Sequence, residues 1–357
     1  MPSTHVDLSN ASVISKEKLH AFMCSCMATV DCETSHASQL AHVLIAGDYR
    51  GHYSHGVNRL GMYVNDIKLG VCSGRGQPKV LKDAPGTAWV DGQNLLGPVV
   101  GNFCMDLAIE KAKTAGIGWV VCKGSNHYGI AGWYSMRAME QGMIGICMTN
   151  TSPIEYPTRA AQAALGTNPL SVAAPSTSVD DHFVLDMATT AVAVGKIPHN
   201  WAVDGRGRET RDPKVMLKEG GLYPLGGAEV TSGYKGYGLS AMVELLCGIL
   251  GGATWGPHVR RWMNTDREAD LGQCFAAINP EMFAPNFSGR VTDMVRTMRS
   301  LPTTEPNKPV LVAGDPEREH MQTCDQLGGI PYHPNQMEYM INLAKQLGVP
   351  PPEVVRN

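Results

Sequence analysis

Apolar residues at helical spacing predict three helices in the first part of the chain. Residues 15–30 repeat apolar side chains at intervals of three and four, and Ser15 can cap the first turn. A second helix is expected over residues 35–46, ending at Gly47, and a third is expected to begin at Ser54. The pattern therefore predicts a helical N-terminal region.

The pattern then changes to short apolar runs that alternate with helical stretches. Residues 87–93 alternate apolar and polar positions, as an edge strand or a hairpin arm does. Further strands are predicted over 117–122, 143–148, 168–175 and 182–189, and helices over 100–115 and 130–141. The last two strands are so close in sequence that antiparallel pairing is favoured, so the predicted sheet is mixed.

The C-terminal half has a weaker pattern. Residues 198–233 are rich in glycine, proline and charge and predict mostly loop. The remaining predictions are an apolar helix over 239–250, an irregular segment over 256–275, strands with turns over 275–283 and 309–317, and a last helix over 335–347.

Composition and charge are those of a globular enzyme with a substantial core. The 357 residues, 43% of them hydrophobic and 18% charged, indicate two domains or one large domain with an appendage. The net charge is −3 and no basic block stands out, so no nucleic-acid partner is expected.

No apolar run approaches the roughly 20 residues of a membrane span, and the first residues lack a signal core, so we expect no membrane partner and a cytoplasmic location. The ten cysteines form no C-x-x-C pair and predict buried free thiols.

No standard nucleotide-binding fingerprint is present. The glycine-rich stretch GYKGYG, residues 233–238, has the wrong spacing for a dinucleotide fold, and TTAVAVGKI, residues 189–197, has Thr190 where a P-loop needs glycine. The sequence therefore predicts neither a Rossmann nor a Walker site.

Two histidines stand where a substrate could be bound. In RGHYSHGVNRL, residues 50–60, a helix capped by Ser54 would present His55 and Arg59 on one face. An arginine binds a carboxylate with two parallel hydrogen bonds, and a histidine can protonate the adjacent carbonyl oxygen. His127 follows a predicted strand in the loop Ser125-Asn126-His127. The alternatives are a surface helix start and a plain polar turn.

Three later stretches could hold an anion or a cofactor. Thr167 and Asn168 lie in a turn that could present hydrogen-bond donors, or could serve as a turn alone. Asp186 ends an apolar strand and could orient a histidine, bind a ribose hydroxyl or cap a helix. Lys235, between glycines at a helix start, suits phosphate or a Schiff base with pyridoxal phosphate, unless it is a surface lysine. His52 and His55 lack the companions of a zinc pattern, so no metal is expected.

Five of these motifs occur together in one known family. SHGVNR at 54–59, SNHYG at 125–129, GTNP at 166–169, DMAT at 186–189 and GYKGYGL at 233–239 resemble, in this order, the type 2 malate/L-lactate dehydrogenase family. That family includes ureidoglycolate, sulfolactate and diketogulonate oxidoreductases and cyclic imine reductases. The resemblance extends from about residue 10 to about residue 345.

The resemblance implies a fold and a cofactor. The fold is α/β (α+β): a non-Rossmann NAD(P)-binding domain with a mixed, largely antiparallel sheet, plus a helical domain built from both chain ends. In this sequence the helical domain would comprise residues 1–75 and 320–357, and residues 76–319 would form the NAD(P)-binding and substrate region. The cofactor is NAD or NADP, and the assembly is a homodimer with its active site near the subunit interface.

The resemblance also implies the site residues. The catalytic residues are His55, His127, Arg59 and Asp186. The substrate contacts are Ser54, His55, Arg59 and His127. The cofactor contacts are His127, Thr151, Thr167, Asn168, Leu185, Asp186, Met187, Ala188, Tyr234, Lys235, Gly314 and Asp315. Ala313 and Pro316 depart from the family's Pro-Gly-Glu pattern around the last two positions.

The implied activity is NAD(P)-dependent interconversion of a small malate- or lactate-like 2-hydroxy acid and its 2-oxo acid, by hydride transfer with histidine acid–base catalysis. The alternatives are a pyridoxal-phosphate enzyme using Lys235 and a non-catalytic homologue. The sequence leaves open which 2-hydroxy acid or cyclic imine is used, NAD versus NADP, and which histidine donates the proton. A second anionic group on the substrate would need another cation, for which Arg50 and Arg159 are candidates.

Overall fold

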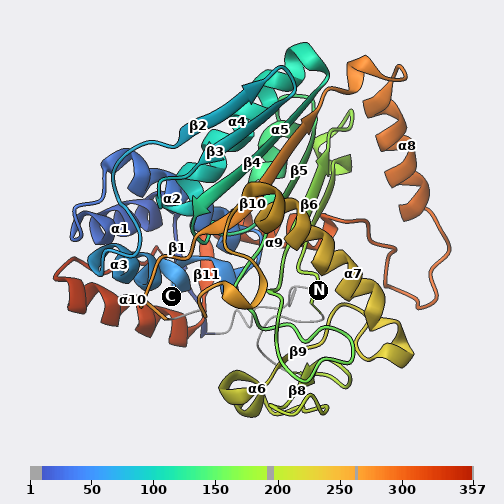
Figure 1. Ribbon diagram of the computed structural model, residues 1–357. Helices are drawn as coiled ribbons and strands as arrows, with labels where there is room; N and C mark the ends of the chain where they lie inside the picture. The colour runs from blue at the N-terminus through green and yellow to red at the C-terminus, as the bar shows by residue number, and fades with distance from the viewer. Residues whose placement is uncertain (1–9, 191–196, 262–263, 356–357) are drawn as a thin grey trace.

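The computed structural model describes residues 10–190, 197–261 and 264–355, and it is built around one mixed sheet (Figure 1). The order of the seven strands across the sheet is β2 (Lys79–Ala84), β3 (Thr87–Asp91), β4 (Ile117–Ser125), β10 (Leu271–Ile278), β5 (Ile144–Thr149), β6 (Leu170–Ala174) and β7 (Phe183–Met187). Only β3 and β4 pair in parallel among these neighbours; the other five pairings are antiparallel. The mixed, largely antiparallel sheet is therefore confirmed.

Strand β10 occupies the centre of the sheet although it comes late in the sequence. Its Phe275 pairs with Val120 of β4 on one side and with Cys147 of β5 on the other. The sequence predicted an irregular segment up to residue 275, but the strand already begins at Leu271. A central strand covered on both faces needs no apolar–polar alternation, so the pattern gave no signal for its first half.

Helices cover the two faces of the sheet. On one face lie α4 (Gly97–Ala115) and α5 (Gly132–Met139). On the other face lies α7 (Gly233–Glu244), which continues into a π-helical turn at Leu245–Ile249 and packs Val243 and Cys247 against the sheet. The predicted loop region also holds α6 (Pro213–Glu219) and a two-stranded antiparallel sheet of β8 (Ala202–Val203) and β9 (Gly221–Leu222).

Both chain ends meet beside the sheet. Strand β1 (Ser12–Ile14) pairs antiparallel with β11 (Ile330–Tyr332). The helices gathered around this pair are α1 (Lys16–Ala28), α2 (Thr34–Tyr49), α3 (Leu60–Lys68), α9 (Asp315–Leu327) and α10 (Pro334–Leu347) (Figure 1). One cluster of buried residues joins these helices to the α4 face of the sheet. The predicted domain boundaries near residues 75 and 320 stay predictions.

The N-terminal helices correct the sequence predictions at two points. Helix α1 has its expected cap, since Ser15 Oγ accepts from the Lys18 N–H at 3.3 Å. Helix α2 does not end at Gly47 but continues to Tyr49. The third helix does not begin at Ser54, because residues 53–55 and 57–59 form two short 3₁₀ turns separated by Gly56, and α3 starts at Leu60.

The C-terminal region differs more from the prediction. Helix α8 (Phe287–Arg299) was not predicted. The strand expected over residues 309–317 is wrong: the chain is irregular until Gly314 and then enters α9. Gly314 has a φ of 99°, which glycine adopts without strain, and Pro316 lies in the first turn of the helix, where its missing N–H costs nothing.

Two global properties follow from the described part of the chain. All ten cysteines are free, and all but Cys24 are buried, as the sequence predicted. None of the helices in the described ranges combines the length and the apolar character that crossing a bilayer requires. Most of the P-loop-like stretch lies at 191–196, outside the described residues.

Close contact between α4 and β4 depends on Gly118. A Cβ at this position would lie 1.9 Å from the Ala108 carbonyl oxygen, so Gly118→Ala is expected to lower the free energy of unfolding by about 1–3 kcal/mol through overpacking. Thermal unfolding of Gly118→Ala and of the wild type measures this effect, and a variant midpoint equal to that of the wild type would contradict it.

Candidate active site

The predicted site residues gather at one end of the sheet. Strand β4 ends there at Ser125, opposite the first residue of β10. The register of the neighbouring strands places Leu170, the first residue of β6, opposite Met148 and Met187. The loop with His127, the segment before β6 and the end of β7 therefore lie at the same edge.

A buried amide network fixes the loop that carries His127. Ser125 Oγ donates to Gln273 Oε1 at 2.8 Å, and Gln273 Nε2 donates to the Asn126 carbonyl at 2.9 Å. Asn126 Nδ2 in turn donates to the Leu95 carbonyl at 2.9 Å. Because buried polar groups are costly to leave unpaired, this network holds the backbone on which His127 stands.

The segment with His55 is fixed by the buried carboxylate of Asp48. Asp48 Oδ2 accepts from the Val57 N–H at 2.9 Å and from the Tyr332 hydroxyl at 2.7 Å. Gly56 allows this approach, since a Cβ there would lie 1.7 Å from Asp48 Oδ1. Ser54 does not cap a helix, as the sequence had suggested; its Oγ lies 2.8 Å from His55 Nδ1.

The two histidines face each other as nearly parallel rings. The ring centroids of His55 and His127 are 5.8 Å apart, with an interplanar angle of 17°. His127 Nδ1 lies 2.5 Å from the Tyr63 hydroxyl oxygen and 3.4 Å from the Gly129 backbone nitrogen. A backbone N–H can only donate, so the neutral His127 ring carries its proton on Nε2 and accepts at Nδ1.

The surroundings keep both rings neutral. Burial, helped by the charges of Arg59 and His52, lowers the pKa of His55 to about 4. Burial also lowers the pKa of His127 well below the ordinary 6.5, helped by His55 and Arg59. A neutral imidazole at pH 7 is ready to accept a proton.

Arg59 completes the group that the sequence predicted. It is half-buried, and its Nε donates to the Ser54 carbonyl at 2.6 Å. Its charge lowers the pKa of both histidines, so Arg59 lies close enough to act on His55 and His127. A guanidinium beside two neutral imidazoles can bind a carboxylate while an imidazole takes a proton from the neighbouring carbon's hydroxyl.

Asp186 lies at the start of α5 rather than against these rings. Its Oδ2 accepts from the Gly132 N–H at 2.7 Å, which satisfies a free donor at the helix start. Burial raises its pKa, while His52, the Gly132 N–H and Arg50 oppose that rise. Among the described contacts, Asp186 makes no hydrogen bond to His55 or His127.

Further charged groups act on Asp186: Arg50, which the sequence analysis named as a candidate for a second substrate anion, and His52 and Glu317, which it did not name as substrate or cofactor contacts. His52 Nε2 lies 3.4 Å from Glu317 Oε1 on α9. Arg50 is 9% exposed, and its Nη1 lies 3.4 Å from the Met321 sulfur. Arg159, the other candidate for a second substrate anion, is instead exposed and paired with Glu229.

The cofactor candidates of the turn before β6 lie beside the end of β7. The Thr189 N–H donates to the Thr167 carbonyl at 2.9 Å, which joins the two segments. Thr151 Oγ1 lies 3.3 Å from Thr167 Oγ1, and both residues are half-buried, as are Leu185, Met187 and Ala188. The side chain of Asn168 is fully buried and bonded internally, so it shapes the turn.

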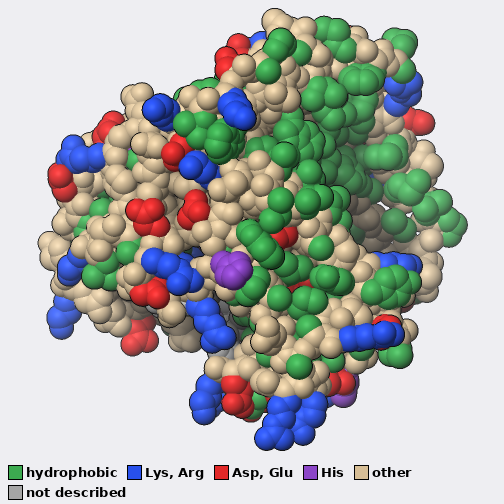
Figure 2. Space-filling model, viewed as in Figure 1, with side chains coloured by type: hydrophobic (Ala, Val, Ile, Leu, Met, Phe, Trp, Pro, Cys, Tyr) green, Lys and Arg blue, Asp and Glu red, His purple; other side chains and the backbone are tan. Residues whose placement is uncertain are grey.

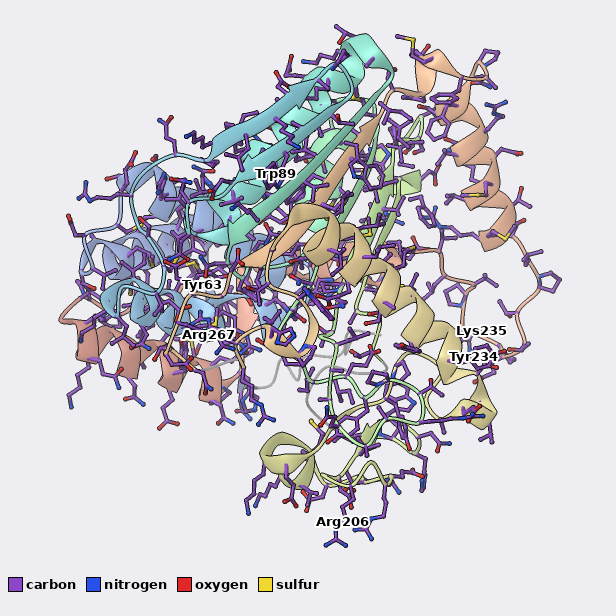
Figure 3. All side chains as sticks on the ribbon, viewed as in Figure 1. Tyr63, Trp89, Arg206, Tyr234, Lys235 and Arg267 are labelled. Carbon is purple, nitrogen blue, oxygen red and sulfur yellow. The ribbon has the colours of Figure 1, made fainter. Side chains whose placement is uncertain are left out.

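Two other groups of cofactor candidates lie apart from the histidines. Tyr234 and Lys235 are exposed at the start of α7, and Figure 3 shows them on the opposite side of the molecule from Tyr63. The Asp315 carboxylate is held by Arg299 and Arg318, with the nearest oxygen 2.6 Å and 2.5 Å away, beside Gly314 at the start of α9.

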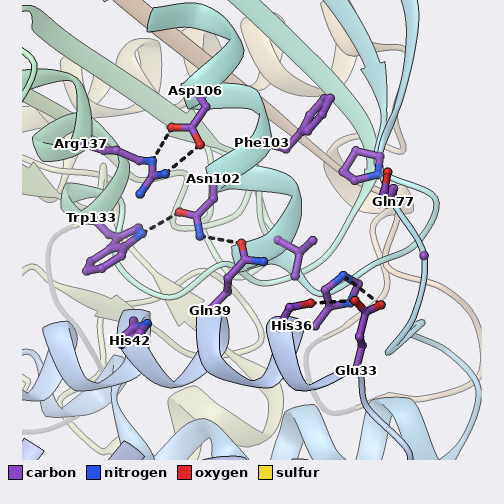
Figure 4. Close-up of a pocket in the computed structure, with 14 residues that line it drawn as sticks. Glu33, His36, Gln39, His42, Gln77, Asn102, Phe103, Asp106, Trp133 and Arg137 are labelled. Atoms are coloured by element: carbon purple, nitrogen blue, oxygen red, sulfur yellow. Dashed lines mark hydrogen bonds and ion pairs between the residues drawn. The ribbon is translucent and has the colours of Figure 1, made fainter.

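A hollow of about 430 Å³ lies elsewhere, between α2, α4, α5 and residues 76–78 (Figure 4). Its polar groups satisfy one another: Trp133 Nε1 donates to Asn102 Oδ1 at 2.8 Å, and Asn102 Nδ2 donates to Gln39 Oε1 at 2.9 Å. Arg137 pairs with Asp106 on the rim. Neither histidine of the pair lines this hollow, so the candidate site is distinct from it.

Sequence reasoning missed Tyr63, which contacts His127. Tyr63 follows Arg59 by one helical turn and is 2% exposed, so its spacing was an available signal. Asp48 and Gln273, which hold the two histidine segments, gave no signal, because their partners are far away in sequence.

Comparison with known proteins shows the family and the fold of the chain. The family model for malate/L-lactate dehydrogenase matches residues 14–341. Malate dehydrogenase of Pyrococcus abyssi is 38% identical over 349 residues, covering 94% of this chain and 95% of that protein. L-sulfolactate dehydrogenase of Methanocaldococcus jannaschii is 37% identical over 322 residues, covering 87% and 90%. The solved structure of malate dehydrogenase from Pyrococcus horikoshii OT3 superimposes with a TM-score of 0.90 at 37% identity, covering 97% and 98%.

The chain therefore belongs to the malate/L-lactate dehydrogenase family, and its fold is that of the family's dehydrogenases. It is an oxidoreductase of the malate dehydrogenase-like type. This assignment favours a dehydrogenase over the pyridoxal-phosphate alternative based on Lys235 and over a non-catalytic homologue.

The titration of the histidines tests the site geometry. We expect His55 to titrate at about 4 in NMR spectra, with its signal assigned by a His55→Gln variant. Arg59→Gln should raise the pKa of both His55 and His127, because it removes a positive charge that disfavours the protonated rings. Arg159→Gln, on the exposed surface, should leave both values unchanged. A His55 pKa near 6.5 would contradict the burial of the pair.

Proposed function

We propose that this chain interconverts a small 2-hydroxy acid of the malate or lactate type and its 2-oxo acid, with NAD or NADP as cofactor. The observation that carries the proposal is the pair of neutral, parallel histidines beside Arg59. A cation for the carboxylate and a proton acceptor for the adjacent hydroxyl are the groups that 2-hydroxy acid oxidation needs.

Each side chain has one task in this scheme. Arg59 binds the substrate carboxylate, and its planar fork fixes the orientation of the 2-carbon. The Nε2 atom of His55, whose Nδ1 lies 2.8 Å from Ser54 Oγ and can carry the ring proton, accepts the proton of the 2-hydroxyl. The Nε2–H of His127 donates a hydrogen bond to the same oxygen. A bound nicotinamide cofactor accepts the hydride from the 2-carbon. Tyr63 holds His127 through Nδ1, so Nε2 stays directed at the substrate.

The reverse direction uses the same groups. A bound carboxylate offsets the charge of Arg59, which otherwise lowers the pKa of both rings. Substrate binding therefore raises the histidine pKa and allows the imidazole to hold the proton that the carbonyl oxygen of a 2-oxo acid receives.

The chain offers a strip of groups that fits a dinucleotide. Thr151 and Thr167 present hydroxyls beside the end of β7, and residues 185–188 continue the strip towards α5. Asp186 uses Oδ2 for the Gly132 N–H, and its Oδ1 is available to accept from a ribose hydroxyl or a carboxamide. The buried side chain of Asn168 holds the Thr151 backbone through Oδ1, which accepts from the Thr151 N–H. The exposed Tyr234 and Lys235 are consistent with a contact to the site of a second subunit.

An apolar stripe along α7 supports a homodimer. Large apolar side chains are exposed at helical spacing along this element: Tyr234, Tyr237, Met242, Leu245, Ile249 and Leu250. Figure 2 shows hydrophobic side chains gathered on this face, over α7 and the strands above it. A contiguous exposed apolar surface of this kind is typical of a protein interface, and we assign it to a second copy of the chain. The helical domain of residues 1–75 and 320–357 lies away from α7 in this scheme.

The kinetic test uses the absorbance at 340 nm with a panel of 2-oxo acids, each with NADH and with NADPH. His55→Ala and His127→Ala should each lower kcat by about 10²–10⁴-fold, the range for lost acid–base catalysis, while far-UV circular dichroism stays unchanged. Full activity of the double variant, or no turnover of any 2-oxo acid by the folded wild type, would contradict the proposal.

The dimer is tested by sedimentation of a charged variant. Leu245, 57% exposed on α7, should become buried in the dimer, so Leu245→Glu is expected to shift the protein to monomers. Val179 is 74% exposed outside the stripe, and Val179→Glu should leave the dimer intact. A monomeric wild type, or a dimer that persists in Leu245→Glu, would show that α7 is not the interface.

A further inference from the structure

The carboxylate of Glu155 is buried without a hydrogen-bond partner. Glu155 is 0% exposed, and neither of its oxygens has a partner among the described residues. The hydroxyl of Ser240 on α7 is near enough to lower the pKa of Glu155, but it completes no hydrogen bond of ordinary geometry. An ionised carboxylate in such a place would be costly, since nothing compensates for the water it has lost.

A second buried carboxylate, that of Glu244, acts on Glu155 through its charge and has its own hydrogen-bond donors in place. Glu244 Oε1 accepts from Asn150 Nδ2 at 2.8 Å and from the Gly256 N–H at 2.9 Å. Glu244 Oε2 accepts from Asn168 Nδ2 at 2.8 Å. The pair can carry one negative charge easily and two only at high cost, and the donors place that charge on Glu244.

Glu244 is connected directly to the turn that the proposed function gives to the cofactor. The same Asn168 that donates to Glu244 accepts from the Thr151 N–H through its Oδ1, at 3.1 Å. Thr151 in turn contacts Thr167. A movement of Glu244 would therefore reach both threonine hydroxyls through one side chain, that of Asn168.

We propose that Glu155 is a positioning residue that keeps the cofactor turn in place only while its carboxyl group is protonated. The neutral carboxyl group does not repel the Glu244 carboxylate. When its proton leaves to solvent, the carboxylate repels Glu244, and the Glu244–Asn168 contact that supports Thr151 is weakened. Cofactor binding therefore becomes weaker at alkaline pH. This inference rests on the proposed function.

The direction of the titration agrees with this assignment. Burial, with a smaller contribution from the charge of Glu244 and against the Ser240 hydroxyl, raises the pKa of Glu155 to about 8. The carboxyl group is thus neutral below about pH 8 and charged above it. Among the described residues, Glu244 on α7 is the one whose charge acts on the titration of Glu155. His55 and His127 are already neutral in this range.

The test is the dissociation constant of the reduced cofactor that binds at pH 7, NADH or NADPH, measured by its fluorescence from pH 7 to pH 9. For a group with a pKa of about 8 that must be protonated for binding, the constant should rise about tenfold over this range. Glu155→Gln mimics the neutral carboxyl group, so its constant should stay flat. Glu110→Gln, on the exposed side of α4, should follow the wild type.

A second variant tests Glu155 by shifting the pH at which cofactor binding weakens, instead of abolishing that weakening. Ser240→Ala removes the hydroxyl that lowers the pKa of Glu155, so the alkaline weakening should begin at higher pH than in the wild type. If Glu155→Gln does not fold, Ser240→Ala still shows whether ionisation of Glu155 weakens cofactor binding.

The results separate this inference from the proposed function. A wild-type constant that stays flat from pH 7 to pH 9 overturns the role of Glu155 and leaves the dehydrogenase intact. A rise that persists in Glu155→Gln, or that Ser240→Ala does not shift, overturns it as well. No binding of either cofactor at pH 7 overturns the proposed function together with this inference.

Discussion

The buried carboxylate of Asp48 is the contact on which the arrangement of the site depends. It receives hydrogen bonds from the backbone of Val57 and from Tyr332, so it ties the segment with His55 to the strand β11 near the other end of the chain. Burial raises the pKa of Asp48 to about 7, which shows how strongly the interior disfavours its charge. The pairing of β1 with β11 and the packing of α9 against α2 bring Tyr332 within reach of this one side chain.

Burial also sets the protonation states on which the chemistry relies. Burial removes water from His55, His127 and Glu155, and this disfavours the charged form of each group. The two histidines are therefore neutral, and Glu155 keeps its proton. The site therefore holds His55 ready as a base at neutral pH. Arg59 is the positive group that the substrate carboxylate meets beside them.

The sequence could predict those parts of the site that depend on residues close together in the chain, and it missed those that depend on contacts between distant residues. His55, Arg59 and His127 were predicted together, from local spacing and from the family resemblance, and the structure brings them together. Ser54 was expected to cap a helix, but Gly56 and the bond from Val57 to Asp48 break that helix into two turns. No local pattern reports that bond.

The two larger errors in the predicted secondary structure also come from contacts that no local pattern reports. Strand β10 is central because it pairs with β4 on one side and with β5 on the other. Its own residues do not alternate between apolar and polar. The stretch 309–317 has the composition of a strand, but Asp315 starts a helix there, bound by Arg299 and Arg318. The roles of Thr151, Lys235 and the other cofactor candidates stay predictions.

The central claim is that a buried, neutral histidine accepts the substrate's proton. The pH dependence of kcat/KM for 2-hydroxy acid oxidation tests it most directly, because this parameter reports the ionisation of the free enzyme. The account predicts activity that stays level as the pH falls through 6.5 and declines only as it approaches the pKa of about 4 of His55. A decline centred at 6.5 would contradict it, because it would identify the proton acceptor as a histidine exposed to water.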